Sequence, residues 1–181
     1  MKCKTSIILI AYMTLLFCLA KVNASEIKLS YNLQQSLNWQ ESDLMALEDR
    51  ITSYTLKDYP KLVMTFTYID SDFSEVIKQH SLDKLIEHIL AGKSTIFSMM
   101  NVETTLIGKK LTKEKNVSVL HLKTSYVLGK STYFLIEKFY IVKGETLLTS
   151  LRWTSNEEQS DIFKDALKDF ENVKVNQVIT K

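Results

Sequence analysis

Apolar residues recur along two stretches of the chain with the spacing of an amphipathic helix. In the first stretch they fall at positions i, i+3, i+4, i+7 and i+8, as Leu82, Leu85, Ile86, Ile89 and Leu90. In the second stretch one face carries Ile162, Phe163, Ala166, Leu167 and Phe170. The pattern therefore predicts two main helices, each with one apolar side.

Capping and breaking residues mark the ends of the first helical segment. Asp72 with Glu75 predicts an N-terminus ahead of the apolar stripe, and Ser81 is an alternative cap that would divide the segment in two. Gly92 is placed to end the helix, although the apolar residues within 96–100 leave a longer helix open.

The second helix has a stronger start signal. Ser155 with Glu158 predicts a capping box at its N-terminus. The acidic Glu157 and Glu158 would then lie in its first turn, with Lys164 and Lys168 further along, which agrees with the helix dipole.

The remaining patterned segments are rich in β-branched and aromatic residues. A strand is expected to start within 27–37. Residues 43–56 fit a helix or a strand, with a strand favoured for 51–56, which would form a hairpin with 62–69 around the turn 58–61. Further runs with short turns between them predict an antiparallel meander: 102–111, 117–128, 132–142 and 146–153. The third of these runs is apolar on both faces, which favours a central strand.

The order of these elements is hairpin, helix, four-stranded meander and helix. It predicts an α+β domain in which an antiparallel sheet packs against two main helices. The composition, with 45% hydrophobic and 24% charged residues, is typical of a globular protein and argues against a disordered chain. With four glycines, one proline and no repeat or linker, residues 25–181 are expected to form a single domain.

The first 24 residues have the pattern of a secretory signal peptide. Lys2 and Lys4 precede an uncharged run over 6–20, which is short for a membrane span of about 20 residues. Cleavage is expected between Ala24 and Ser25, with cleavage after Ala20 and an uncleaved anchor as the alternatives. The pattern indicates a periplasmic or secreted protein.

Processing at this site would change the chemistry of the chain. Both cysteines, Cys3 and Cys18, lie in the leader, so the remaining chain offers no thiol nucleophile, cysteine-ligated zinc site or disulfide. Lipid attachment at Cys18 is disfavoured because the bulky Phe17 precedes it. The leader also carries three lysines and no acid, so the net charge falls from +2 to −1 and gives no electrostatic footprint for nucleic acid.

Two segments resemble the end of a phosphate-binding loop, Gly92-Lys93-Ser94-Thr95 and Gly129-Lys130-Ser131-Thr132. That loop needs an earlier glycine, and the required positions hold Glu87 and Thr124. A helix end and a hairpin turn explain the two segments better.

The other candidates for chemistry are equally incomplete. His80, His88 and His121 do not have the spacing of a helical zinc site, and the acidic segment 70–75 lacks the glycine of a calcium loop. No serine stands in a Gly-x-Ser-x-Gly elbow. We therefore expect no catalytic residue, no cofactor and no metal ligand.

The tryptophans are the remaining candidates for binding. Trp153 shares its strand parity with Leu147 and Leu151, which favours core packing. Trp39 follows the first expected strand and is a candidate binding aromatic, with core packing as the other interpretation.

From Leu82 to Val173 the order of elements resembles the PsbP-like fold, an α/β/α sandwich. The resemblance rests on a helix, a strand ending near Gly108, two long strands, the turn 143–145, a strand ending at Trp153 and a capped helix closed by Asp169-Phe170. Many relatives have Ser-Phe in place of Asp-Phe, and no Pro-Gly-Trp turn surrounds Trp39. The group includes a photosystem accessory protein, a Ran-binding import factor and small exported bacterial proteins. It implies a non-catalytic binding or assembly role, with no functional residue carried over.

These observations favour an exported, non-catalytic protein that binds another envelope or secreted protein as an accessory factor of the bacterial cell envelope. One alternative is an immunity or inhibitor protein against a toxin that acts in the envelope. Carriage of a small ligand and hydrolysis are the further alternatives. After processing, no stable membrane span is expected.

Overall fold

A computed structural model describes residues 27–42, 50–69, 73–79, 81–98, 102–114, 117–158 and 160–179. The helices are α2 (Phe73–Gln79), α3 (Leu82–Ser98) and α4 (Asp161–Glu171). The strands are β1 (Ile27–Asn32), β2 (Gln40–Ser42), β3 (Ile51–Leu56), β4 (Tyr59–Ile69), β5 (Thr104–Glu114), β6 (Val117–Leu128), β7 (Ser131–Val142), β8 (Glu145–Thr154) and β9 (Lys174–Ile179). The predicted signal peptide, with its cleavage site at Ala24 and Ser25, lies outside the described residues.

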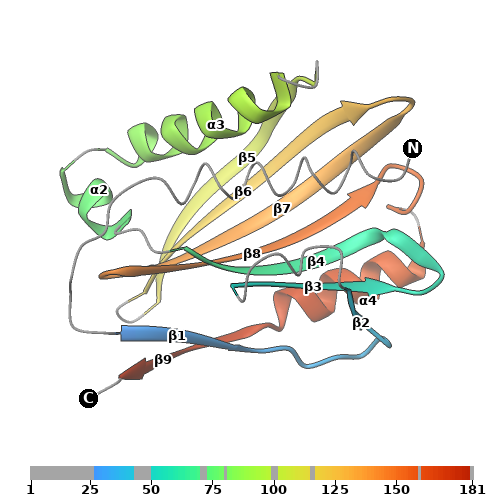
Figure 1. Cartoon of the computed structure of the whole chain (residues 1–181), viewed down its shortest axis with the longest axis horizontal. Helices are drawn as coiled ribbons and strands as arrows, with labels where there is room; N and C mark the ends of the chain where they lie inside the picture. Colours follow the sequence, from blue (N-terminus) through green and yellow to red (C-terminus); the bar gives the residue numbers. More distant parts are fainter. Residues whose placement is uncertain are drawn as a thin grey trace.

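Seven strands form one antiparallel sheet in the order β2-β3-β4-β8-β7-β6-β5 (Figure 1). The predicted hairpin is β3 and β4, and the predicted meander is β5 to β8. The two parts join because β4 pairs with β8. Strand β7 lies between β6 and β8, which confirms the central position that its apolar residues on both faces predicted.

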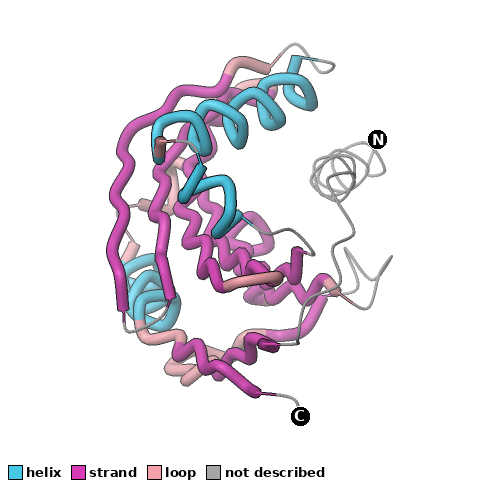
Figure 2. The backbone as a smooth tube through the Cα atoms, turned by 90° about the vertical axis from the view of Figure 1, so that its left-hand side faces the viewer, coloured by secondary structure: helices cyan, strands magenta, loops and turns pink. Residues whose placement is uncertain are grey.

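Helices cover the two faces of the sheet, so the predicted α+β sandwich is confirmed (Figure 2). On one face α2 and α3 pack onto a cluster that includes Leu85, Ile89, Leu122 and Phe139. On the other face α4 packs through Phe163 and other apolar residues onto a second cluster. The alternation of side chains along each strand separates these two cores.

Strands β1 and β9 form a separate two-stranded antiparallel ribbon from the two ends of the described chain (Figure 1). The start of β1 falls within the predicted segment 27–37, but β9 is not among the predicted strands. The apolar side chains of the ribbon pack on the same cluster as α4, because Leu29 is buried there and Tyr31 and Val175 are partly buried.

The structure corrects the predicted end of the first helix. Helix α3 continues past Gly92 to Ser98, which is the longer alternative. The next residue, Lys93, is buried and paired with Glu137 of β7, so packing on the sheet outweighs the low helix propensity of glycine. The alternative cap at Ser81 is confirmed, since its Oγ accepts a hydrogen bond from the Lys84 N–H at 3.4 Å and α2 ends before it. Asp72 lies outside the described residues.

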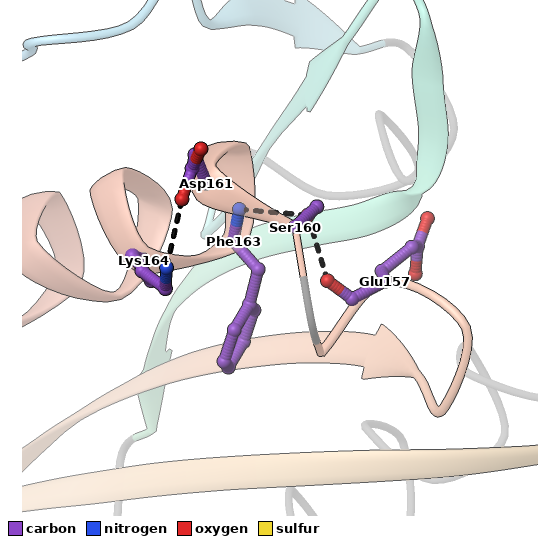
Figure 3. Close-up of polar contacts among 5 residues, drawn as sticks. All are labelled: Glu157, Ser160, Asp161, Phe163 and Lys164. Atoms are coloured by element: carbon purple, nitrogen blue, oxygen red, sulfur yellow. Dashed lines mark hydrogen bonds and ion pairs between the residues drawn. The ribbon is translucent and has the colours of Figure 1, made fainter.

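The predicted capping box of the last helix is wrong. Ser160 is the N-cap of α4, and its Oγ accepts a hydrogen bond from the Phe163 N–H at 3.1 Å (Figure 3). Residues Ser155 to Glu158 form a turn instead, in which the Glu157 carboxylate accepts hydrogen bonds from the N–H and Oγ of Thr154. The sequence pattern of a capping box is therefore present at Ser155, but the helix begins later in the chain and is capped by Ser160.

The turns also differ in detail from the prediction. The hairpin between β3 and β4 turns at Lys57 and Asp58. Pro60 lies within β4, in the irregular segment 60–62 that has no register partner on β3, which is the kind of position where a strand tolerates proline. Gly108 marks a bulge inside β5 rather than the end of a strand. The turns between β6 and β7 and between β7 and β8 contain Gly129 and Gly144, whose φ values of 65° and 86° favour glycine.

Candidate binding cleft

A cleft of about 670 Å³ lies between the main sheet and the C-terminal part of the chain. We call it the β9 cleft. Its volume is within the range of roughly 300–1,000 Å³ that is usual for ligand pockets. The residues that line it come from β6, β7, the end of α4 and β9: Val117, Val119, His121, Lys138, Tyr140, Glu171, Val173, Lys174, Val175, Asn176 and Gln177.

The floor of the β9 cleft is one face of β6 and β7. Val117, Val119 and His121 stand two residues apart along β6, so their side chains share a face. On β7 their neighbours in register are Tyr140, opposite Val119, and Lys138, opposite His121. The floor is therefore apolar toward the start of β6 and basic further along the strand.

Strand β9 forms a wall of the cleft. Four consecutive residues, Lys174 to Gln177, line it. Successive side chains of a strand point to opposite sides, so four consecutive lining residues indicate that the strand presents its edge, with backbone N–H and C=O groups, to the cleft. Strand β1 pairs with the other edge, and within the described residues it is the only strand neighbour of β9.

The buried lysine of the cleft, Lys138, and the histidine on its floor, His121, have polar partners. The side chain of Lys138 is only 5% exposed, and its Nζ lies 2.7 Å from Oε2 of Glu171, which stands at the rim with 54% exposure. The same ammonium lies 4.7 Å from the ring centroid of Phe170. Nε2 of His121 is 3.3 Å from Oγ1 of Thr112 on β5. A buried ammonium needs such partners, because desolvation without them is costly.

Aromatic and polar contacts hold the wall against the sheet. The ring of Tyr31 on β1 stacks on Phe66 of β4, with ring centroids 3.9 Å apart. The backbone N–H of Leu29 donates to the carboxylate of Glu145 at the start of β8. The β1–β9 ribbon is thus fixed to the main sheet through β1, whereas β9 borders the cleft.

A buried carboxylate joins α4 to the segment that follows β1. Asp169 accepts hydrogen bonds from the N–H of Ser36 at 2.9 and 3.0 Å, the Oγ of Ser36 at 2.6 Å and the N–H of Leu37 at 3.2 Å. It also accepts one from the indole Nε1–H of Trp39 at 2.9 Å. Asp169 is the residue that replaces serine in the Asp-Phe pair noted in the sequence, and Phe170 beside it is fully buried.

The N-terminal end of α4 is fixed by local contacts (Figure 3). Besides capping the helix, Ser160 donates through its Oγ to the Glu157 carbonyl oxygen at 2.7 Å. Asp161 and Lys164 form an exposed ion pair at 2.7 Å, and the hydrogen bond from that ammonium lowers the pKa of Asp161. Both ends of α4 are therefore held, and its last residue, Glu171, reaches the cleft.

The candidate binding aromatic Trp39 lies in the core rather than at the β9 cleft. It is 6% exposed, and its indole N–H is engaged with Asp169. Its role in binding stays a prediction. Trp153 is fully buried, with its ring centroid 4.8 Å from that of Phe163, so its predicted core position is confirmed.

The other residues tested for chemistry are placed apart from one another. His88 is exposed on α3, His121 lies in the cleft, and His80 is outside the described residues. Lys93 forms a buried ion pair with Glu137 inside α3 and β7, and Gly129 lies in a hairpin turn, so neither phosphate-loop segment has the shape of such a loop. Among the described residues no group of three or more His, Cys, Asp and Glu is placed to hold a metal ion.

Lys138, Glu171 and β9 were not predicted to be parts of a site. One weak signal was available, since Val173, Val175 and Ile179 share the parity of one strand face, although Gln177 interrupts that face. The cleft itself is lined by both β6 and β9, two segments far apart in the chain. Periodicity within one segment carries no information about such a contact.

Comparison with solved structures shows the fold. The solution structure of a cyanobacterial PsbP protein, CyanoP from Synechocystis sp. PCC 6803, superposes with a TM-score of 0.60 at 9% sequence identity. The match covers 87% of this chain and 97% of CyanoP. The chain has a PsbP-like fold. The PsbP-like α/β/α sandwich expected from the order of elements is thereby confirmed, while the low identity transfers no activity or partner.

Two other solved structures are similar over most of their length but superpose less well on this PsbP-like chain. A protein from Pseudomonas aeruginosa, described as a putative regulator of unknown function, has a TM-score of 0.39 at 10% identity, covering 81% of this chain and 83% of its own. LpqN, involved in cell envelope biogenesis of Mycobacterium tuberculosis, has a TM-score of 0.47 at 14% identity, covering 83% and 85%. No family model matches the sequence, and no curated protein does. None of the helices within the described residues has the length and apolar character to span a membrane.

Proposed function

We propose that this chain is an exported accessory protein of the bacterial cell envelope that acts by binding a partner protein and not by catalysis. The β9 cleft carries the proposal, because it combines an apolar floor, a few charged groups and the edge of a strand in one surface depression. The secretory pattern of the first 24 residues supports export. The PsbP-like fold is compatible with this role by analogy.

The contacts that Lys138 and His121 make in the cleft support binding over catalysis. A general acid or base needs to be aimed at a reacting group. Here the Lys138 ammonium points at Glu171 and at the ring of Phe170, and His121 contacts a threonine hydroxyl. Such contacts hold side chains in place and give a binding surface its specificity.

The experiment is a cross-linked capture from the envelope of the bacterium that produces the protein. An affinity tag is inserted between Gly129 and Lys130. These residues form the exposed turn that joins the end of β6 to the start of β7, and neither lines the cleft. We expect the tagged protein in the envelope fraction with one saturable, stoichiometric protein partner. A cytoplasmic location would contradict the proposal, as would the absence of any partner above the level of a tag-only control.

A further inference from the structure

We propose that the edge of β9 opposite β1, which pairs with no strand among the described residues, receives an extended segment of the partner. The segment joins the β1–β9 ribbon as a third strand above the floor formed by β6 and β7. This inference rests on the proposed partner-binding function and specifies its site and the chemistry of the bound segment.

The first observation is the geometry of the wall. Strand β9 pairs through one edge with β1, from Lys174 opposite Asn32 to Ile179 opposite Ile27. The consecutive residues that line the cleft show that the opposite edge faces it. Backbone groups at an unpaired edge are a template for another strand, and an incoming extended peptide satisfies them with main-chain hydrogen bonds.

The second observation is the orientation of the side chains on the ribbon. Residues directly opposite each other in an antiparallel pair point to the same side. Val175 is paired with Tyr31 and Gln177 with Leu29, and Val175, Tyr31 and Leu29 pack on the α4 cluster, so this side of the ribbon faces the main sheet, with Gln177 exposed at its end. Lys174 and Asn176 then face outward and are exposed. A strand added beside β9 would continue this alternation, with every second side chain directed at the floor.

The third observation is the chemistry of the floor and rim. Inward side chains of the added strand would meet Val117, which is partly exposed, above the buried Val119 and Tyr140. Among the charged residues that line the cleft, Lys138 is paired with Glu171, so the remaining formal charge of +1 belongs to the exposed Lys174 on the outward side of β9. The segment that fits is extended, with apolar residues in alternate positions and acidic residues between or beside them.

The other long edge of the structure is less suited to this role. Strand β5 ends the main sheet, but a bulge interrupts it between Leu106 and Gly108. Lys109, Lys110 and Lys113 are exposed along it. Bulges and lysines are the usual devices by which proteins protect an edge from further pairing.

The test uses hydrogen exchange at the backbone amides of 174–177, with a synthetic eight-residue peptide of alternating valine and glutamate as the probe. In the free protein, alternate amides of β9 are protected by β1 and the others exchange rapidly. With about 1 mM peptide and a Kd of about 0.1 mM, about nine-tenths of the protein is occupied, so we expect the rapidly exchanging amides to slow by about tenfold. The matched peptide of valine and lysine should leave them unchanged.

Two variants of the full chain show whether the floor is involved. Val117→Asp places a negative charge on the floor, whereas Val127→Asp makes the same change on the same face of β6 at an exposed position outside the cleft. We expect loss of the amide protection only in Val117→Asp. The comparison of the two peptides needs no variant, so it decides the question even if Val117→Asp folds poorly.

Several results would overturn the inference. These are no slowing with the valine–glutamate peptide, equal slowing with the lysine peptide, or slowing at β5 or β2 instead of β9. If the capture experiment identifies a partner and that partner leaves the β9 amides unprotected, strand addition fails while the partner-binding function stands. If no partner is captured, the proposed function fails irrespective of the peptide result.

Discussion

Asp169 connects α4 to the segment after β1, and its removal gives a quantitative test of the fold. In Asp169→Ala the acceptor of the hydrogen bonds from Ser36, Leu37 and the Trp39 indole is lost. Asp169→Ser is the matched milder change, because it introduces the serine found in many relatives of the PsbP-like fold and keeps one oxygen acceptor.

The magnitude follows from where the orphaned donors lie. The indole N–H of Trp39 is buried, so leaving it unpaired costs about 1–3 kcal/mol. Ser36 is exposed, so its donors turn to water and the net loss is smaller, about 0.5–1.5 kcal/mol for each hydrogen bond. Because neighbouring losses do not add fully, we expect Asp169→Ala to lower the free energy of unfolding by about 3 kcal/mol, and Asp169→Ser by about half of that.

The assay is urea unfolding followed by circular dichroism, together with exchange of the Trp39 indole proton by NMR. For a chain of this length about 3 kcal/mol corresponds to a fall in Tm of roughly 6–12 °C. Asp165→Ala, an exposed position on the same helix, is the control and should change stability by less than about 0.5 kcal/mol. If Asp169→Ala were no less stable than Asp165→Ala, or left the exchange of the indole proton unchanged, the reasoning would be refuted.

Three further expectations follow from the contacts. Glu137→Gln should lower the free energy of unfolding by about 3–5 kcal/mol because it removes the carboxylate that is paired with the buried ammonium of Lys93. Lys93→Met with Glu137→Leu should stay near wild type, and equal losses in urea titrations would contradict this. Ser160→Ala should cost about 1 kcal/mol and Ser155→Ala almost nothing, and the reverse order in thermal melts would restore the capping box inferred from sequence. Burial raises the pKa of Tyr126, so the folded state keeps a proton that the unfolded chain releases, and stability should fall as the pH rises above about 10. Tyr126→Phe should reduce that fall in urea midpoints measured across this range, and an unchanged pH dependence would exclude Tyr126 as its source.

The elements that sequence predicted best are those whose pattern is local. Strand β6 has the predicted bounds, and β3 matches the favoured strand of the hairpin, because alternation and short turns are properties of neighbouring residues. The apolar stripe of α3 is also confirmed, since Leu85 and Ile89 are buried against the sheet. The order of these elements was sufficient to indicate the PsbP-like fold.

The elements that sequence missed depend on distant contacts. Helix α3 passes Gly92 because Lys93 reaches Glu137, which lies 44 residues away. Strand β9 forms against β1 at the other end of the described chain. The β9 cleft also depends on a distant contact, because Lys138 of β7 is paired with Glu171 at the end of α4. Neither residue shows a distinguishing pattern in its own segment of the sequence.

The central claim is that the β9 cleft binds the partner, and the most direct measurement is the cross-linked capture repeated with two variants. The amount of partner recovered with Val117→Asp is compared with that recovered with Val127→Asp and with the wild type, after circular dichroism has shown that all are folded. We expect Val127→Asp to recover as much partner as the wild type and Val117→Asp to recover none. Equal recovery of the partner by both variants would contradict the claim and place the binding surface elsewhere on the protein.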